Sequence, residues 1–208
     1  MLIAITGNSG TGVSTVSSVW KKINSGLNVC SLDKVAHRFL NKLSVKKELE
    51  KELLINGLSE MTTDEIRILL REKAFSDPNV LLAINRILHP RLQRWVFFKA
   101  NELKTKNTIF VLDAALIFEL QLEKCFDYIV TVSDKQSRVI ERLVKRDKIT
   151  EDTVKNRWKN QLDLSDKRSR SHFVITNSGS MEELEIKADN FYKNVLQRME
   201  GANGTQNA

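Results

Sequence analysis

The sequence begins Met1-Leu2-Ile3-Ala4-Ile5-Thr6-Gly7-Asn8-Ser9-Gly10-Thr11-Gly12-Val13-Ser14-Thr15, and this stretch decides the fold. Its first five residues form an apolar run long enough for a buried strand, and beyond the glycines apolar residues recur at helical spacing. A strand, a glycine-rich loop and a helix in this order are the context that a phosphate-binding loop requires. The glycines let the backbone turn several N–H groups toward one anion, and the helix N-terminus adds its partial positive charge.

One position departs from the phosphate-loop pattern. The pattern G-x-x-x-x-G-K-[ST] is met from Gly7 to Ser14, except that Val13 occupies the place of the lysine that reaches the β- and γ-phosphates. Ser14 stands where a hydroxyl group binds Mg²⁺ in such loops. Without the lysine, the loop alone leaves two interpretations open: nucleotide binding and a tight structural turn.

The composition predicts one domain, or one domain with a sizeable insertion. Of the 208 residues, 41% are hydrophobic and 28% are charged, which suits a packed core under a polar surface. No apolar stretch approaches the ~20 residues that span a bilayer, and the apolar start lacks the basic segment of a signal peptide. Cys30 and Cys125 fit free thiols in a reducing compartment. We therefore expect a cytoplasmic protein without a membrane partner.

The net charge of +7 indicates an anionic partner, either a nucleic acid or a small molecule. Lysines and arginines are scattered through the predicted helices and form no basic block interleaved with aromatic residues. This distribution disfavours nucleic acid and is compatible with a polyphosphate pocket.

Short apolar runs alternate with helical patterns along the chain. This alternation predicts an α/β fold with a five-stranded, parallel, doubly wound sheet of the phosphate-loop NTPase type. The expected strands are residues 1–5, 27–32, 108–113, 127–132 and 172–176.

The remaining segments predict the domain organisation. We expect a nucleotide-binding core formed by residues 1–40, 107–147 and 171–198, and a disordered tail at 199–208. A leucine-, lysine- and glutamate-rich stretch, residues 41–106, reads as a helical insertion on the substrate side. Residues 148–170 read as a helical lid, because their apolar periodicity is weak.

Two aspartates follow predicted strands, where open α/β sheets bind their ligands. Asp33 could accept the proton of an acceptor hydroxyl group, or it could simply be a helix N-cap. Asp113 ends the third strand, as does the acidic residue that supports Mg²⁺ in many phosphate-loop enzymes; helix capping is again the alternative.

Two further features carry structural and functional alternatives. His89 precedes a proline that we expect to interrupt a helix, and a histidine there is either structural or part of a pocket. Arg138, Arg142 and Arg146 recur every four residues after Ser133-Asp134, which we expect to cap their helix. They form either a solvated face or a group that stabilises charge on a transferred phosphoryl group. A short helix is also expected from Ala114.

Taken together, the spaced elements resemble the dephospho-coenzyme A kinase family from residue 1 to about residue 196. No single element is specific, but their order and spacing are. They comprise Gly7 to Thr15, Asp33, His89-Pro90, Leu116-Ile117-Phe118-Glu119, the segment from Arg142 to Asp147, Arg157 with Gln161, and Asn177-Ser178-Gly179.

The resemblance implies ATP-dependent phosphorylation of the ribose 3′-hydroxyl group of dephospho-CoA, the last step of coenzyme A synthesis. It implies ATP and Mg²⁺ as cofactors, no nucleic-acid partner, and a monomer or weak homo-oligomer. Residue by residue, it implies a base at Asp33, a phosphoryl contact at Arg142, an adenine contact at Asn177 and a CoA-side contact at His89. The backbone cradle would comprise Gly10, Thr11, Gly12, Val13, Ser14 and Thr15, and the metal contacts would be Ser14 and Asp113.

The departures from the family pattern define an alternative function. Val13 replaces the lysine, Ser31-Leu32-Asp33 keeps only the second acid of the usual Asp-x-Asp, and Ala115 replaces a proline. Lys34, Arg142 or Arg146 would compensate in an active enzyme. Otherwise the chain is a degenerate member that binds nucleotide or CoA with little or no phosphoryl transfer. Another small-molecule kinase, a nucleic-acid kinase or a basic binding module is a third class.

Overall fold

The computed structural model describes residues 1–106, 108–159 and 161–197, so the predicted tail lies outside the described residues. The chain divides into two compact units. We call Met1–Cys30 with the described residues from Ala100 onward the sheet unit, and Ser31–Lys99 the helical unit.

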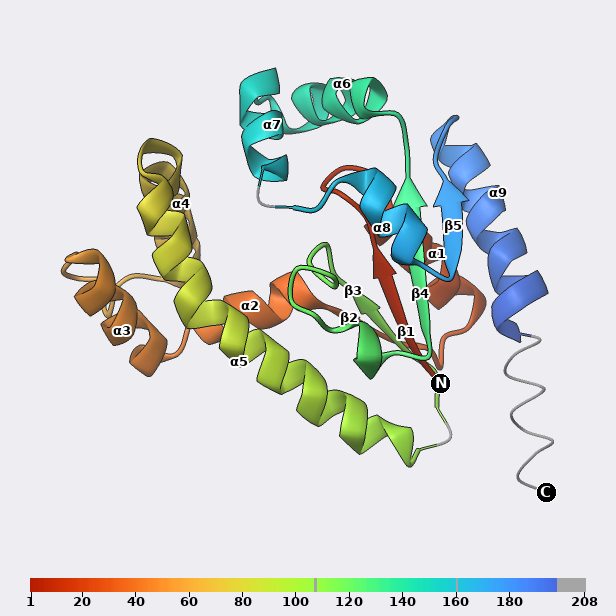
Figure 1. The fold of residues 1–208 in the computed structure, drawn as a ribbon, viewed down its shortest axis with the longest axis horizontal. Helices are drawn as coiled ribbons and strands as arrows, with labels where there is room; N and C mark the ends of the chain where they lie inside the picture. Colours follow the sequence, from red (N-terminus) through yellow and green to blue (C-terminus); the bar gives the residue numbers. More distant parts are fainter. Residues whose placement is uncertain (107, 160, 198–208) are drawn as a thin grey trace. The chain divides into compact units, whose positions relative to one another are not determined.

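A five-stranded parallel sheet forms the centre of the sheet unit and confirms the predicted fold class (Figure 1). Its order is β2-β3-β1-β4-β5. The strands are β1 (Leu2–Thr6), β2 (Asn28–Ser31), β3 (Phe110–Asp113), β4 (Tyr128–Ser133) and β5 (Phe173–Thr176).

The register of the sheet gathers the carboxyl ends of the strands at one edge. Ile5 of β1 lies opposite Asp113 of β3, and Thr6 lies opposite Thr131 of β4. All five residues of β1 are buried, as expected of a central strand covered on both faces. The glycine-rich loop therefore leaves the sheet at the edge where α/β folds bind ligands.

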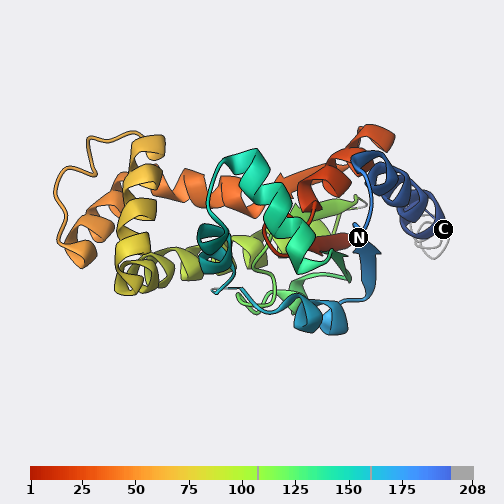
Figure 2. The same cartoon turned by 90° about the horizontal axis from the view of Figure 1, so that it is seen from above.

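Helices cover both faces of the sheet, as Figures 1 and 2 show. One face packs against α1 (Val13–Ile23) and α9 (Met181–Phe191), which continues into η2 (Tyr192–Leu196). Trp20 of α1 is fully buried, donates through Nε1 to the Ala188 carbonyl at 2.9 Å, and stacks on Phe191. On the other face, α8 (Leu164–Arg170) contacts β4.

The helical unit contains α2 (Leu32–Leu40), α3 (Leu43–Leu53), α4 (Thr63–Ser76) and most of α5 (Pro78–Lys104). A capping box between Thr62 and Glu65 starts α4. The predicted break at Asp77-Pro78 is confirmed, because Asp77 is the C-cap of α4 and Pro78 opens α5.

The predicted interruption at Pro90 is wrong, because α5 runs through it. A proline inside a helix removes one backbone hydrogen bond and costs ~3 kcal/mol. Buried Ile87, Leu88, Leu92 and Val96 on both sides of Pro90 explain why the helix continues, since their burial outweighs that cost.

Two other local predictions are also wrong. Residues 115–121 form turns in place of a short helix, and the next helical element is the 3₁₀ turn η1 (Glu123–Cys125). Helix α6 (Gln136–Asp147) has Lys135 as its N-cap, because the buried carboxylate of Asp134 pairs with Arg142.

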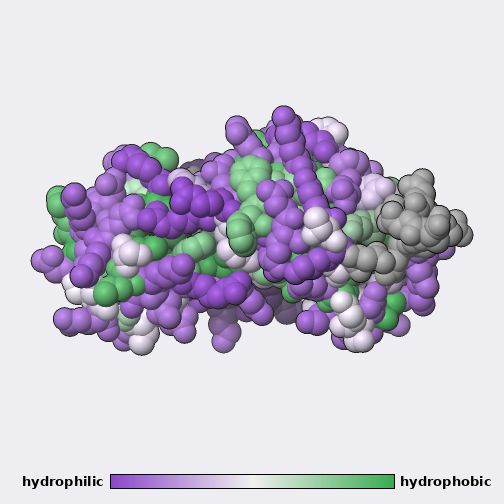
Figure 3. Space-filling model, turned by 90° about the horizontal axis from the view of Figure 1, so that it is seen from below, coloured by the Kyte–Doolittle hydropathy of each residue, from purple (hydrophilic) through white to green (hydrophobic). Residues whose placement is uncertain are grey.

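The surface is mostly hydrophilic on the face drawn in Figure 3, with scattered apolar side chains. On α9, Met181 and Ile186 are exposed, at 60% and 54%, while Leu184 of the same helix is buried. Within the described ranges, no helix is long and apolar enough to cross a membrane.

Replacing Trp20 by phenylalanine tests the packing of α1 on α9. We expect Trp20→Phe to lower the free energy of unfolding by ~1–3 kcal/mol, because it loses ring volume and the bond to Ala188. Urea denaturation followed by circular dichroism measures this change. The control Phe98→Leu, at a side chain that is 72% exposed, should stay within ~0.5 kcal/mol. Equal losses of unfolding free energy in Trp20→Phe and Phe98→Leu would contradict the role of Trp20 in packing α1 on α9.

Candidate active site

Two glycines of the loop have backbone conformations that other residues rarely adopt. Gly10 has a φ of 90° and Gly12 a φ of 105°. A Cβ atom on Gly12 would lie 2.8 Å from Asn177 Nδ2 and 2.8 Å from a methyl carbon of Leu184. A Cβ on Gly10 would meet Leu143 at 2.7 Å. Side chains are therefore excluded at both positions, and the loop is held close against α6 and α9.

Helix α1 begins without a side-chain cap. Gly12 is its N-cap residue and makes no side-chain hydrogen bond, and the first turn contains no acidic residue. The first N–H groups of an α-helix have no intrahelical acceptor, and here the Thr15 and Val16 N–H groups are the ones that donate back to the Gly12 carbonyl, both at 3.1 Å. Lys21 and Lys22 occupy the last turn, where positive charge suits the helix dipole. The start of α1 is thus electropositive and suited to an anion.

Val13 is the first residue of α1, and its side chain packs partly buried against the core cluster under the sheet. A valine side chain has no donor for a phosphate oxygen. Ser14 follows with an exposed side chain. The loop therefore keeps its backbone nest and hydroxyl group but lacks the usual ammonium group.

Asn177 supports the loop from the end of β5. Its side chain is 5% exposed, and Nδ2 donates to the Thr11 carbonyl at 2.8 Å. Its backbone N–H donates to Ser133 at 2.7 Å. The structure thus places Asn177 beside Thr11 and Gly12, and its contact with adenine stays a prediction.

Arg142 connects α6 to the loop. One guanidinium nitrogen donates to the Gly10 carbonyl at 2.8 Å, and another pairs with Asp134 at 2.6 Å. The Asp134 side chain is fully buried, so this ion pair offsets the cost of desolvating its charge. Arg142 lies at the loop as predicted, while its contact with a phosphoryl group stays a prediction.

Asp113 and Ser14 are linked through Ser17. The Ser17 hydroxyl group donates to the Ser14 carbonyl at 3.2 Å and lies 3.4 Å from Asp113 Oδ2. Across the described ranges, no group of three or more histidine, cysteine, aspartate or glutamate side chains could hold a metal ion. A few oxygen donors beside a phosphate site fit Mg²⁺, which binds through one or two carboxylates together with substrate phosphates.

The segment from α7 (Glu151–Trp158) onward holds the loop at Ser9. Trp158 Nε1 donates to the Ser9 carbonyl at 3.3 Å, and the Ser9 N–H donates to Gln161 Oε1 at 3.2 Å. Sequence reasoning assigned no role to Trp158 or Gln161. The signal available for Gln161 was its place in the family pattern with Arg157.

A buried ion pair holds the other end of this segment. Lys167 of α8 is fully buried, and its Nζ lies 2.9 Å from Glu119 Oε1 and 2.6 Å from the Ala115 carbonyl. Burial lowers the pKa of Lys167, and the charge of Glu119 partly opposes that shift. Glu119 also accepts from the Leu162 N–H at 2.8 Å. The segment between α7 and α8 is therefore tied to the turn after β3.

Asp33 and His89 belong to the helical unit. Asp33 is exposed in the first turn of α2, whose N-cap is Ser31 with its hydroxyl oxygen accepting from Lys34, so the capping alternative for Asp33 is wrong. His89 lies on α5 and is partly buried. The structure brings together the loop, Asp113, Arg142 and Asn177, and the approach of Asp33 and His89 to the loop stays a prediction.

Comparison with known proteins decides the family. The dephospho-CoA kinase family model matches residues 1–183. The chain belongs to the dephospho-CoA kinase family. A dephospho-CoA kinase of Helicobacter pylori is 31% identical over 202 residues, which cover 93% of this chain and 97% of the relative.

Solved structures share the fold along nearly the whole chain. A protein of Thermus thermophilus matches with a TM-score of 0.71 and 28% identity, covering 94% of this chain and 97% of that one. The dephospho-CoA kinase of Campylobacter jejuni matches with a TM-score of 0.67 and 22% identity, covering 97% and 98%. The phosphate-loop fold predicted from the resemblance is confirmed.

A double-mutant cycle tests the ion pair between Glu119 and Lys167. We expect Lys167→Met to lower the free energy of unfolding by ~3–5 kcal/mol, because it leaves a carboxylate without its partner charge. Adding Glu119→Gln should recover much of that loss, since glutamine can still accept from Leu162. Urea denaturation of the single and double variants measures the coupling. Strictly additive losses would show that the two charges do not stabilise one another.

Proposed function

We propose that this chain transfers the γ-phosphoryl group of ATP to the ribose 3′-hydroxyl group of dephospho-CoA, giving coenzyme A and ADP. The observation that carries the proposal is the uncapped, glycine-shaped start of α1, a nest of N–H groups suited to a polyphosphate. Membership of the dephospho-CoA kinase family is the reason for proposing dephospho-CoA as the phosphoryl acceptor.

The residues of the loop bind and orient the donor in this proposal. The backbone from Gly10 to Thr15 holds the phosphates, and Asn177 contacts the adenine. The Ser14 hydroxyl group and the Asp113 carboxylate hold Mg²⁺ together with phosphate oxygens. Bound Mg²⁺ neutralises charge on the phosphates of the donor.

The acceptor side uses the helical unit. Asp33 accepts the proton of the 3′-hydroxyl group as its oxygen bonds to the γ-phosphorus and the bond from that phosphorus to the β-bridging oxygen breaks. The exposed position of Asp33 in the first turn of α2 suits this role. His89 and the helical unit contact CoA, and residues 148–170 close over the nucleotide as a lid.

A second function is favoured by Val13. Losing the lysine removes a charge-assisted hydrogen bond, and if that bond acts in the transition state the rate falls by ~10²–10³. The backbone nest does not depend on the lysine, so nucleotide binding survives the loss. The alternative is a family member that binds nucleotide or CoA with little phosphoryl transfer.

ADP formation from Mg²⁺-ATP, with and without dephospho-CoA, tests the proposed function. We expect turnover that requires the acceptor and falls by ~10²–10⁴ in Asp33→Asn, because the amide cannot take the proton. The control Asp189→Asn removes a carboxylate on α9 that pairs with Lys193 at the surface, and should leave turnover unchanged.

The variant Val13→Lys separates the two functions. An active enzyme that compensates for the lysine gains little from this change. Turnover that is absent in the unsubstituted chain and appears in Val13→Lys would identify the degenerate member. Absence of turnover in every variant, with Mg²⁺-ATP still bound, would reject the kinase.

A further inference from the structure

A cavity of about 260 Å³ lies between the phosphate-binding loop and α7. The loop contributes Asn8 and Thr11 to its lining, and the α7 segment contributes Lys155, Trp158 and Lys159. Two lysines thus face the same space as a loop whose own lysine is replaced by Val13.

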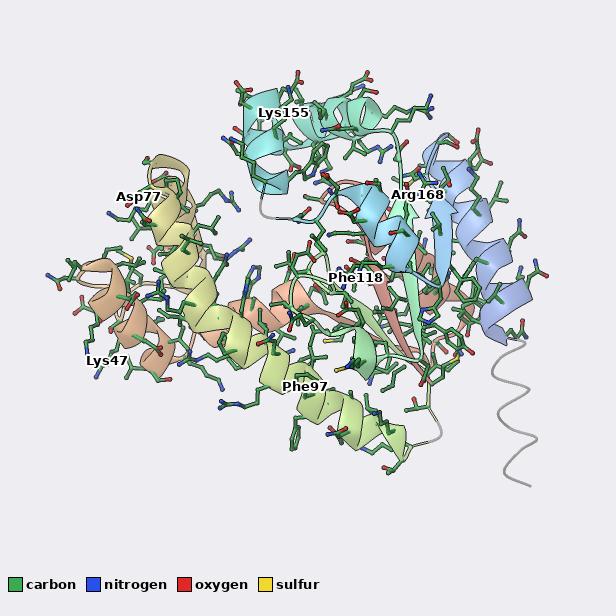
Figure 4. The ribbon with its side chains drawn as sticks, viewed as in Figure 1. Lys47, Asp77, Phe97, Phe118, Lys155 and Arg168 are labelled. Carbon is green, nitrogen blue, oxygen red and sulfur yellow. The ribbon has the colours of Figure 1, made fainter. Side chains whose placement is uncertain are left out.

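The orientation of α7 is set by a hydrogen bond. Trp158 Nε1 donates to the Ser9 carbonyl at 3.3 Å, so the Trp158 side of the helix is turned toward the loop. Residues three and four positions apart share one side of a helix. Lys155, which is labelled in Figure 4, therefore lies on the same side as Trp158 and Lys159, and all three line the cavity.

The charges around the cavity leave the lysines available for an anion. Asp134 is paired with Arg142, and Asp163 is exposed at the N-cap of α8. Lys155 pairs with Glu151 at 2.7 Å, but both side chains are about half exposed, and such surface pairs hold a lysine only weakly.

The arginines of α6 are less suited to replace the lysine. Arg142 is bound to Gly10 and Asp134, and Arg146 pairs with the neighbouring Asp147 at 2.7 Å. Arg138 donates to the Ser178 carbonyl. Each of these guanidinium groups already has a partner in the protein.

We propose that Lys155 and Lys159 supply, from α7, the ammonium groups that Val13 cannot supply from the loop. They bind the phosphates of the nucleotide in the cavity between α7 and the loop. This inference rests on the proposed nucleotide site but not on phosphoryl transfer, because a degenerate member would use the same lysines to bind ATP.

Binding of Mg²⁺-ATP, measured by isothermal titration calorimetry, tests the proposal. Lys155→Met, Lys159→Met and the double variant are compared with the unsubstituted chain, each with and without Val13→Lys. We expect the double variant to bind Mg²⁺-ATP ~10–100-fold more weakly, the effect of losing a charge-assisted hydrogen bond. Adenosine, which has no phosphate, should bind all variants equally.

Restoring Mg²⁺-ATP affinity with Val13→Lys distinguishes a phosphate contact of the two lysines from a structural role. Val13→Lys should restore most of the affinity of the double variant and change that of the unsubstituted chain less than ~3-fold, since non-additivity is the signature of a shared partner. The control Lys21→Met removes an exposed charge of α1 and should leave the affinity unchanged.

Each outcome decides the proposal. Unchanged Mg²⁺-ATP affinity in the double variant would overturn the proposal. An equal gain in affinity from Val13→Lys in the chain that keeps both lysines and in the double variant would also overturn it. A parallel loss of adenosine binding would overturn it in favour of a structural role for the lysines. Parallel assays of ADP formation with dephospho-CoA report on the reaction separately. If the affinity pattern holds but no ADP forms, the lysine assignment stands and the proposed kinase function fails.

Discussion

The left-handed backbone of Gly12 at the start of α1 is the constraint on which the candidate site depends. It lets the chain turn from β1 into α1 while the first N–H groups of the helix stay uncapped. The same turn brings Gly12 so close to Asn177 and Leu184 that no Cβ fits. Packing and anion binding therefore require the same glycine, and sheet, loop and helix form one structural element.

Val13 shows how such a loop can change its means of holding an anion. A lysine at this position would reach outward, whereas the valine packs against the core cluster and adds apolar contact at the start of α1. What remains on the loop is a set of backbone dipoles and the Ser14 hydroxyl group, and positive charge has to come from neighbouring elements. The contacts of Arg142, Trp158 and Gln161 with Gly10 and Ser9 already join those elements to the loop.

The features predictable from sequence are those determined by local pattern. The strands were predicted within two residues of their observed bounds, and the loop was recognised by its glycines. Continuation of α5 through Pro90 was not predictable from the local pattern, because the pattern shows that apolar residues flank the proline but not how deeply the fold buries them. The pairs Glu119–Lys167 and Ser9–Trp158 join positions 48 and 149 residues apart, and no periodicity marks such contacts.

The most direct test of the central claim is the response of the loop amides to nucleotide. The ¹H–¹⁵N resonances of Gly10, Gly12, Ser14 and Thr15 can be followed by NMR during titration with Mg²⁺-ATP. If backbone N–H groups hold the phosphates, these resonances shift together and saturate with a single dissociation constant. Unmoved loop amides, while other resonances report saturable ATP binding, would contradict the account, because the nucleotide would then bind elsewhere.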